Sequence, residues 1–302
     1  MKVVANLVAD WVIVMRRGLE ANGVKTSSLK TDQEVSLAFW NMVHRTIRTR
    51  PRKVHIAKEF VCPPEHVAVI EALKDKFERG QDVSRHRSSA VLNPKMKAFN
   101  DRLFNDWGVH HLHLGPDNPG KPLTGRTDDC LYVYVTETDV YLLHVLGHGN
   151  YEKREMMLRM HRNWPEIIAE HRAPGATSVD PEDEVEDDGV KTLRGAGFTY
   201  LLVLDGTPYI TPGGGYMKSG NSLPALRRSN SAFATLCGWQ ERLDSEVEDI
   251  VKEMREQGFS PGVPPTFRLH VRSDWFCSAR EPTAKIQIEM GYLVGRPPTS
   301  VS

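Results

Sequence analysis

Histidine is concentrated in one stretch of this sequence. Seven of the twelve histidines fall between residues 110 and 171, namely His110, His111, His113, His144, His148, His161 and His171. Imidazole titrates near neutral pH, so one such side chain can accept a proton in a reaction while another donates one. Imidazole is also a frequent ligand of zinc, iron and manganese. We therefore expect the functional centre between Trp107 and about Trp164.

The alternation of side chains along a β-strand sorts the first three histidines. Residues 109–114 have the pattern of a short strand, in which alternate residues share a face. His111 and His113 then project together, whereas His110 projects to the opposite side. The pair is the strongest candidate for acid–base chemistry.

The later histidines fall on two further predicted elements. Residues 140–146 are predicted to form a strand that carries His144, and His148 follows just beyond its end. Both are therefore candidate partners for the pair across the sheet. His161 and His171 lie in a segment with helical spacing and are interpreted as structural.

Metal-independent cleavage of RNA would use this set of residues. The reaction needs a base for the ribose 2′-hydroxyl, an acid for the leaving oxygen and cations around the phosphate. Arginine is well suited to the last task because its guanidinium binds phosphate through two parallel hydrogen bonds. The predicted catalytic residues are His111, His113, Arg126, His144, His148 and Tyr151.

Two other interpretations of the histidines stay open. His111 and His113 could hold a metal ion with a third histidine from a neighbouring strand, although no nearby carboxylate falls at a familiar ligand spacing. Alternatively, the histidines are polar groups satisfied within a sheet and its loops. We predict no bound metal and no cofactor.

Basic residues cluster at two places outside the histidine pair. They are predicted to contact a nucleic-acid backbone, with a solvated helix end as the alternative. Aromatic side chains do not alternate with them, so base stacking is not indicated. The predicted nucleic-acid-binding residues are Arg45, Arg48, Arg50, Arg52, Lys53, Lys153 and Arg154.

Composition and the remaining motifs exclude several functions. Lys+Arg and Asp+Glu both number 39, so a globally basic nucleic-acid binder is not indicated. The glycine loop at residues 213–215 lacks the ending of a P-loop and is expected to be a tight connection. The four cysteines form no CxxC pair, which fits reduced thiols and a cytoplasmic location. No segment is predicted to span a membrane.

Periodicity predicts the elements that must position these side chains. Helices are expected over residues 3–15, 32–47, 64–79, 94–104, 151–171 and 229–257. Strands are expected over 109–114, 131–136, 140–146, 198–204, 207–211, 266–271 and 285–293, with an Asp205-Gly206 turn in one hairpin.

Together these elements predict an α+β protein with a central antiparallel sheet and a C-terminal α+β part. Residues 1–105 are expected to form a mainly helical region, and residues 106–175 the histidine-rich sheet with a following helix. An acidic linker is expected at 176–190, before the C-terminal region at 191–302.

The histidine region also resembles a known family. The segment from Gly108 to Tyr151 holds two strands around a short acidic turn, with Arg126 upstream and a His-rich, tyrosine-containing tail. It resembles the last hairpin of RelE/ParE-type toxins, a family of small endoribonucleases and gyrase poisons. The wider pattern up to Pro165 resembles uncharacterised bacterial proteins. The resemblance implies a toxin-like activity on RNA.

The resulting prediction is a metal-independent endoribonuclease, acting as a toxin or phage-defence effector on RNA. Its partners would be RNA and a possible protein partner, such as an antitoxin or another defence component. The leading alternative is a non-enzymatic regulatory protein that binds nucleic acid or protein through the basic N-terminal residues and the acidic linker. A metal-dependent hydrolase built on the histidines is the third alternative.

Overall fold

The computed structural model describes residues 2–147, 153–173, 175, 185–198, 200–262, 264–283 and 286–294. These residues divide into two compact units. We call them the central unit (Asn22–Ser28 and Asn41–Pro224) and the terminal unit (Met1–Ala21, Leu29–Trp40 and Ala225–Ser302). All three boundaries predicted from the sequence fall inside the central unit, because segments far apart in the chain pack together there.

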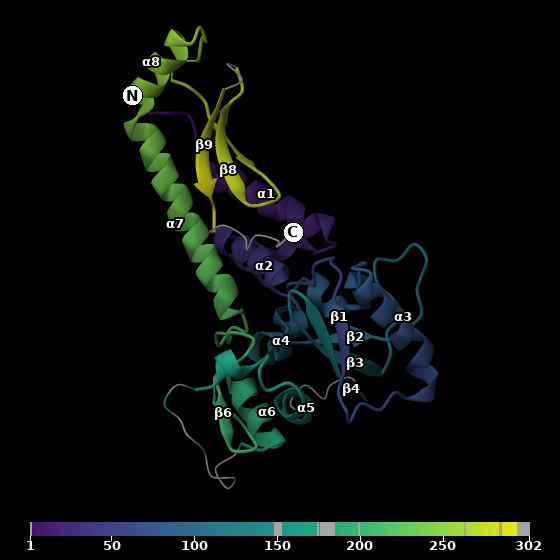
Figure 1. The fold of residues 1–302 in the computed structure, drawn as a ribbon. Coiled ribbons are helices and arrows are strands. Elements are labelled where there is room, and N and C mark those ends of the chain that lie inside the picture. Colours follow the sequence, from purple (N-terminus) through teal and green to yellow (C-terminus); the bar gives the residue numbers. More distant parts are fainter. Residues whose placement is uncertain are drawn as a thin grey trace. The chain divides into compact units, whose positions relative to one another are not determined.

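The chain forms an α+β fold, as predicted (Figure 1). The central unit contains α3 (Val67–Glu78), α4 (Arg102–Trp107), α5 (Glu155–Asn163) and α6 (Asp187–Ala196), with strands β1 (Lys53–Ile56), β2 (Val109–His113), β3 (Asp129–Val135), β4 (Asp139–Gly147), β5 (Leu202–Leu204) and β6 (Thr207–Tyr209). Short 3-10 helices lie at Thr26–Ser28, Pro64–His66, Ser84–His86, Ser89–Leu92, Lys97–Asn100 and Ala169–His171.

The central sheet has the strand order β1-β4-β3-β2. Strands β2, β3 and β4 are antiparallel, as predicted, but β1 pairs with β4 in parallel, with Lys53 opposite Asp139. The sheet is therefore mixed rather than antiparallel. The correction arises from β1, a four-residue strand inside the region expected to be helical.

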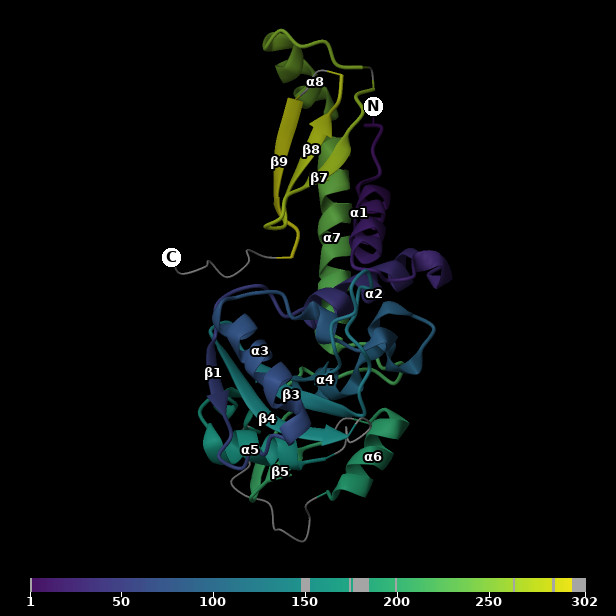
Figure 2. The same cartoon turned by 90° about the vertical axis from the view of Figure 1, so that its right-hand side faces the viewer.

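Apolar side chains cover both faces of this sheet. On one face Leu112, Leu131 and Val133 pack with Ile70 and Phe77 of α3, which lies across the sheet in Figure 2. A second core cluster covers the other face, where Met156, Met157 and Met160 of α5 pack with Val109, Cys130, Tyr132 and Tyr134. Because both faces are buried, β3 is apolar at nearly every position. Alternation places His111 and His113 on the α5 face.

Several local predictions are confirmed in the central unit. The β5–β6 hairpin turns at Asp205 and Gly206, which have φ values of 47° and 74°. Two successive left-handed residues are typical of a type I′ turn. Gly80, after α3, has φ 66° and ends that helix as predicted.

The acidic linker was predicted too long at its C-terminal end. Residues 176–184 lie outside the described residues, but α6 begins at Asp187, inside the predicted linker. Its two acidic residues, Asp187 and Asp188, occupy the first turn, where negative charge stabilises a helix.

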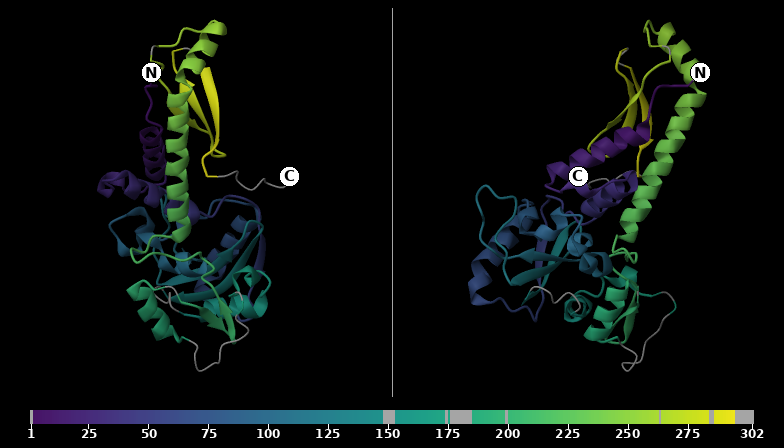
Figure 3. Two further views of the ribbon diagram at one scale, coloured as in Figure 1. Left: turned by 90° about the vertical axis from the view of Figure 1, so that its left-hand side faces the viewer. Right: turned by 180° about the vertical axis from the view of Figure 1, so that it is seen from behind.

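The terminal unit contains α1 (Leu7–Ala21), most of α2 (Asp32–His44), nearly all of α7 (Leu223–Ser245), α8 (Val247–Glu256) and a three-stranded sheet. The sheet is antiparallel, in the order β7 (Arg268–Val271), β8 (Phe276–Glu281) and β9 (Ile286–Tyr292), and it runs beside α7 in Figure 3. Trp11, Phe39, Trp40 and Trp275 form an aromatic cluster with ring centroids 5.4–6.1 Å apart. Within the described residues, no helix combines the length and the apolar composition needed to cross a membrane.

Candidate active site

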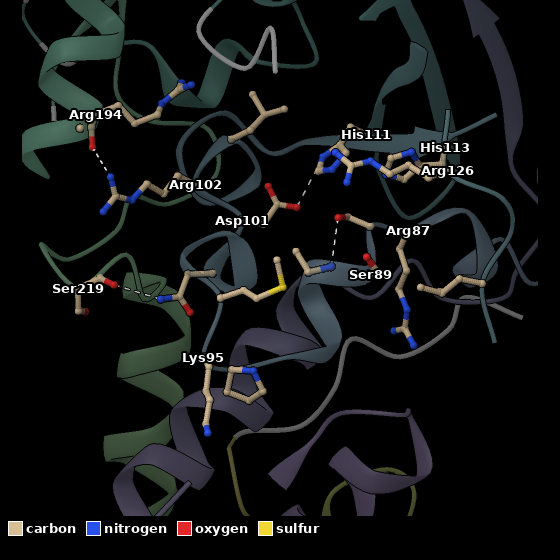
Figure 4. A pocket seen from close by; sticks show the side chains of 18 of the residues that line it. Arg87, Ser89, Lys95, Asp101, Arg102, His111, His113, Arg126, Arg194 and Ser219 are labelled. Carbon is tan, nitrogen blue, oxygen red and sulfur yellow. Dashed lines mark hydrogen bonds and ion pairs between the residues drawn. The ribbon is translucent and has the colours of Figure 1, made fainter. Parts of the chain in front are cut away.

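A cavity of about 930 Å³ lies in the central unit, beside the strand that carries the predicted histidine pair. His111 and His113 of β2 line it together with Arg126, from the loop that precedes β3. Figure 4 shows these three side chains gathered at one side of the cavity. Three of the six residues predicted to be catalytic therefore meet in one place.

The two histidines lie adjacent, as strand alternation predicts. Their ring centroids are 6.1 Å apart with the planes at 73°. His113 is only 5% exposed and lies deep in the cavity wall. His110 projects to the other side, where its ring packs against Phe104 with centroids 4.4 Å apart and the planes tilted by 38°. Burial lowers the pKa of His110 to about 3, so that ring is uncharged at neutral pH.

The lining of the cavity is strongly cationic. Asp101 is its only carboxylate among the described residues. The excess of lysine and arginine over carboxylates creates a positive potential that attracts anions, and arginine in particular favours phosphate. The lysines and arginines that line it are Arg87, Lys95, Arg102, Arg126, Lys191 and Arg194.

These cations differ in whether their side chains already make hydrogen bonds or ion pairs with other protein groups. Arg194 is held by Asp106, with nitrogen–oxygen distances of 2.8 and 3.1 Å. Arg102 donates to the main-chain oxygen of Arg194, at 2.8 Å. In contrast, the side chains of Arg126, Lys95 and Lys191 make no hydrogen bond or ion pair with any described residue. These last three are the charges available to a ligand.

Asp101 is a functional candidate that the sequence analysis missed. Its Oδ2 lies 3.9 Å from Nδ1 of His111, and both side chains are nearly buried. The distance is too long for a hydrogen bond, but it places a carboxylate where it can orient the ring. Asp101 also caps α4, accepting from the backbone N–H of Phe104 at 3.2 Å. The clue in the sequence was its place as an N-cap residue before an apolar helical turn.

His113 has a different neighbour. Its Nδ1 lies 3.7 Å from the sulfur of Cys130 on the adjacent strand. Its main-chain oxygen also lies 2.9 Å from Nδ1 of His86. The two histidines of the pair are thus held by chemically distinct groups.

The remaining predicted catalytic residues are not placed in the cavity. His144 stands opposite Tyr132, which in turn stands opposite His111, so a whole strand separates the two histidines. It does not line the cavity, and burial lowers its pKa, with Arg159 adding to that effect. His148 and Tyr151 lie outside the described residues.

The residues predicted to bind nucleic acid are not gathered into one cationic surface. Arg45 and Arg52 donate to main-chain oxygens, and burial lowers the pKa of Arg45 to about 10. Arg50 pairs with Glu137. Of the predicted residues in this stretch, only Arg48 and Lys53 are exposed.

The second predicted basic group is also engaged within the protein. Lys153 pairs with Asp187, with a nitrogen–oxygen distance of 3.2 Å. Arg154 is buried and donates to the main-chain oxygen of Val203. None of the residues predicted to bind nucleic acid lines the cavity. Its cations come from other residues, and among them only Arg126 is a predicted site residue.

A metal site at the histidine pair finds no support among the described residues. The residues that come close enough to share an ion are Glu65, His66 and Asp129, whose ligand atoms lie within 4.8 Å of one another. Neither His111 nor His113 belongs to such a group. Within the part of the chain that the structure describes, no third histidine, cysteine or carboxylate lies close enough to both rings to complete such a group.

The glycine loop has a structural role. The N–H groups of Gly213 and Gly215 donate to the main-chain oxygens of Asp106 and Asn105, at 2.8 and 2.9 Å. A Cβ at Gly213 would lie 2.1 Å from the main-chain oxygen of Phe104. Only glycine fits, so the loop is the tight connection expected, packed against α4.

Searches against protein-family models, curated proteins and solved structures found no match for this chain. The function is therefore inferred from the geometry of the cavity.

Proposed function

We propose that this chain is a metal-independent endoribonuclease, acting as a toxin or phage-defence effector, with its active site in the cavity of the central unit. One observation carries the proposal. Two adjacent histidines line a cavity in which lysine and arginine greatly outnumber carboxylates. The resemblance of residues 108–151 to RelE/ParE-type toxins favours the same class of reaction.

The chemistry follows from these groups. A neutral histidine accepts the proton of the ribose 2′-hydroxyl as the 2′-oxygen attacks phosphorus. The bond from phosphorus to the 5′-oxygen breaks, and a protonated histidine supplies a proton to that oxygen. Arg126, which lies beside the two histidines in Figure 4, stabilises the charge on the phosphorane, and Lys95 and Lys191 add to the positive potential of the cavity. The products are a 2′,3′-cyclic phosphate and a 5′-hydroxyl, with no net change in protons.

The burial of the histidines limits which form of RNA can be the substrate. His113 is 5% exposed, and the side chain of His111 is 9% exposed, so the linkage to be cut must enter the cavity. The rigid backbone of an RNA duplex lies on the outside of a wide cylinder and cannot enter. We therefore propose single-stranded RNA as the substrate.

The test is cleavage of end-labelled RNA by the purified full chain in the presence of a chelator. We expect single-stranded RNA to be cut and the matching DNA, which lacks the 2′-hydroxyl, to stay intact. His111→Ala should lower the rate by about 10²-fold to 10⁴-fold, the usual contribution of a positioned acid–base group. His171→Ala, outside the cavity, is the control. Equal rates for both variants would show that the cavity is not the active site.

A second candidate function is the binding of an anionic small molecule without catalysis. The cavity volume lies within the range of ligand pockets, about 300–1,000 Å³. Binding of nucleotides that Arg126→Ala abolishes, with no RNA cleavage by the wild type, would favour this regulatory role. Retained nucleotide binding in Arg126→Ala would count against it.

A further inference from the structure

Three side chains that can bind a metal ion meet away from the cavity. Glu65 and His66 are consecutive residues of the 3-10 helix that precedes α3, and Asp129 begins β3. One ligand atom from each residue lies within 4.8 Å of the other two. Asp129 shares a face of β3 with Leu131, which packs in the core cluster of α3. The group therefore lies on the face of the sheet opposite to the cavity histidines.

The fold already holds two of these ligands in contact. Nε2 of His66 lies 3.1 Å from Oδ2 of Asp129, and the two side chains are 12% and 36% exposed. The strand side of the contact is fixed by Thr127. Its hydroxyl donates to the main-chain oxygen of Asp129 at 2.7 Å and accepts from the backbone N–H of Leu114 at 3.0 Å. Little rearrangement of these two residues is needed when an ion binds.

Glu65 adds a second carboxylate to the group. Its side chain is exposed, and it makes no hydrogen bond or ion pair with any described residue. Two carboxylates this close repel each other, and the imidazole of His66 can carry at most one compensating positive charge. A divalent cation would neutralise both carboxylates. The presence of Glu65 therefore favours a bound ion over a simple pair of His66 with Asp129.

The donor atoms indicate which ion would bind. One imidazole nitrogen and two carboxylate oxygens suit zinc, which often has three protein ligands and a water molecule. Calcium prefers about six to eight oxygen ligands, and magnesium keeps several of its waters. Tetrahedral zinc with bonds of about 2.1 Å holds its ligand atoms roughly 3.4 Å apart. His66 and Asp129 are already near that spacing, and rotation of the exposed Glu65 side chain completes the group.

We propose that Glu65, His66 and Asp129 bind a zinc ion, with water as the fourth ligand. The ion would join the start of α3 to the start of β3, because His66 is the N-cap residue of α3 and Asp129 is the first residue of β3. It has a structural role. The cleavage proposed for the cavity uses no metal, so this inference does not depend on the proposed function.

Zinc binding can be measured on the full chain by calorimetry, after removal of metal with a chelator and dialysis. We expect one tight Zn²⁺ site per chain. Loss of a group that only orients a metal ligand weakens binding by about 10-fold to 100-fold, so His66→Ala should weaken it by at least about 100-fold. Glu65→Gln should weaken it by at least about tenfold. This variant keeps the fold, because the exposed Glu65 side chain makes no contact that the fold needs.

A second pair of histidine and carboxylate provides the matched control. Nε2 of His55 lies 2.7 Å from Oδ1 of Asp139, but no third ligand joins them among the described residues. His55→Ala should therefore leave the Zn²⁺ affinity unchanged. His111→Ala should also leave it unchanged, since that ring lies on the other face of the sheet.

Thermal unfolding tests the structural role. Zn²⁺ should raise the melting temperature of the wild type, because an ion that binds only the folded chain stabilises it. The rise should be much smaller in Glu65→Gln, and Mg²⁺ at the same concentration should give little. Co²⁺ in place of Zn²⁺ should show the visible absorption of a four-coordinate ion, which an ion pair of His66 with Asp129 alone would not produce.

Two results would overturn the proposal. One is a wild type that binds no Zn²⁺, and the other is equal affinity in the wild type, Glu65→Gln and His66→Ala, which would show an adventitious ion only. Equal stabilisation by Mg²⁺ and Zn²⁺ would overturn the assignment of zinc. Cleavage of RNA in the presence of a chelator, or its absence, bears only on the proposed function of the cavity.

Discussion

Asp101 has a backbone conformation that costs free energy. Its φ of 43° lies in the left-handed region, which residues other than glycine seldom occupy, though aspartate and asparagine tolerate it best. Such strain is concentrated at functional sites. In this case it turns one side chain toward both the first turn of α4 and the ring of His111.

Asp101→Asn separates the two roles of that residue. Asparagine also caps helices and tolerates this φ, so the melting temperature should change little. The carboxylate charge is lost, however. A unit charge about 4 Å away is worth about 1 kcal/mol even at the dielectric constant of water, which is about fivefold in rate. We expect RNA cleavage to fall at least that far, and an unchanged rate would remove Asp101 from the mechanism.

His110 makes stability depend on pH. Its pKa is lowered to about 3, first by burial and then by His111, His44, Arg52 and Arg45. The unfolded chain binds a proton near pH 6.5, whereas the folded chain binds it only near pH 3. The stability that the neutral ring contributes is therefore complete above pH 6.5 and is lost as the pH falls from there toward 3.

His110→Phe should reduce this dependence. Phenylalanine keeps the aromatic contact with Phe104 and cannot be protonated. In urea unfolding, we expect the wild type to lose more free energy of unfolding between pH 7 and pH 4 than the variant does, by up to a few kcal/mol. Parallel curves for the two proteins would contradict the shifted pKa.

Helices α4 and α6 are joined by a buried ion pair. Arg194 of α6 and Asp106 of α4 are 7% and 0% exposed, and the hydroxyl of Tyr200 donates to the same carboxylate at 3.1 Å. The guanidinium also lies over the ring of Trp107, 4.3 Å from its centroid. Because α6 supplies Lys191 to the cavity, this pair holds one cationic wall in place.

Asp106→Asn should be far more damaging than removal of an exposed ion pair. It leaves a buried guanidinium without its counter-ion, which costs about 3–5 kcal/mol. Asp205→Asn is the matched control, because Asp205 pairs with Arg162 through two 2.8 Å contacts while both stay half exposed. The control should cost less than about 1 kcal/mol. Similar losses of the free energy of unfolding for the two variants would show that the buried pair contributes no more to stability than the exposed pair.

Elements with a strong local pattern were predictable, and those that depend on distant partners were not. The histidine-bearing strand and the β3–β4 hairpin show alternation or turn residues, and the structure confirms them. Strand β1 has four residues and exists because β4 pairs with it. Strand β8 was missed, and the predicted helix over residues 229–257 is interrupted at Glu246, between α7 and α8.

The candidate site was likewise predictable only where a local pattern determines it. Alternation correctly grouped His111 with His113, since it is a local property of one strand. Strand β3 lies between His144 and the pair, and no local pattern encodes the order of the strands. Asp101 and Arg102 reach the cavity from one segment and Lys191 from another that is far along the chain, so only the fold assembles them.

At the scale of the whole molecule, a formal net charge of zero conceals a local excess of positive charge. Affinity for an anionic polymer depends on the charges that it meets, not on the total. Overall neutrality also reduces non-specific attraction to nucleic acid elsewhere on the surface. Binding of RNA should therefore depend on a small number of cations.

The number of those cations can be measured from the salt dependence of RNA binding. For a single strand, the logarithm of the affinity falls with the logarithm of salt concentration, with a slope of about −0.7 for each phosphate neutralised. Arg126→Ala should make the slope shallower by about 0.7, measured with a 2′-O-methyl RNA that cannot be cleaved. Arg48→Ala, at an exposed arginine outside the cavity, should leave the slope unchanged.

The parallel pairing of β1 with β4 has a consequence for how the chain folds. Lys53 meets Asp139, about 86 residues further along, whereas the β3–β4 pair closes over a turn of a few residues. The entropy of closing a loop grows only slowly with its length, so the long connection takes little from the final stability. It delays the search for the native register instead, because distant contacts form late. The hairpin should form early, and β1 should join the sheet as a late step.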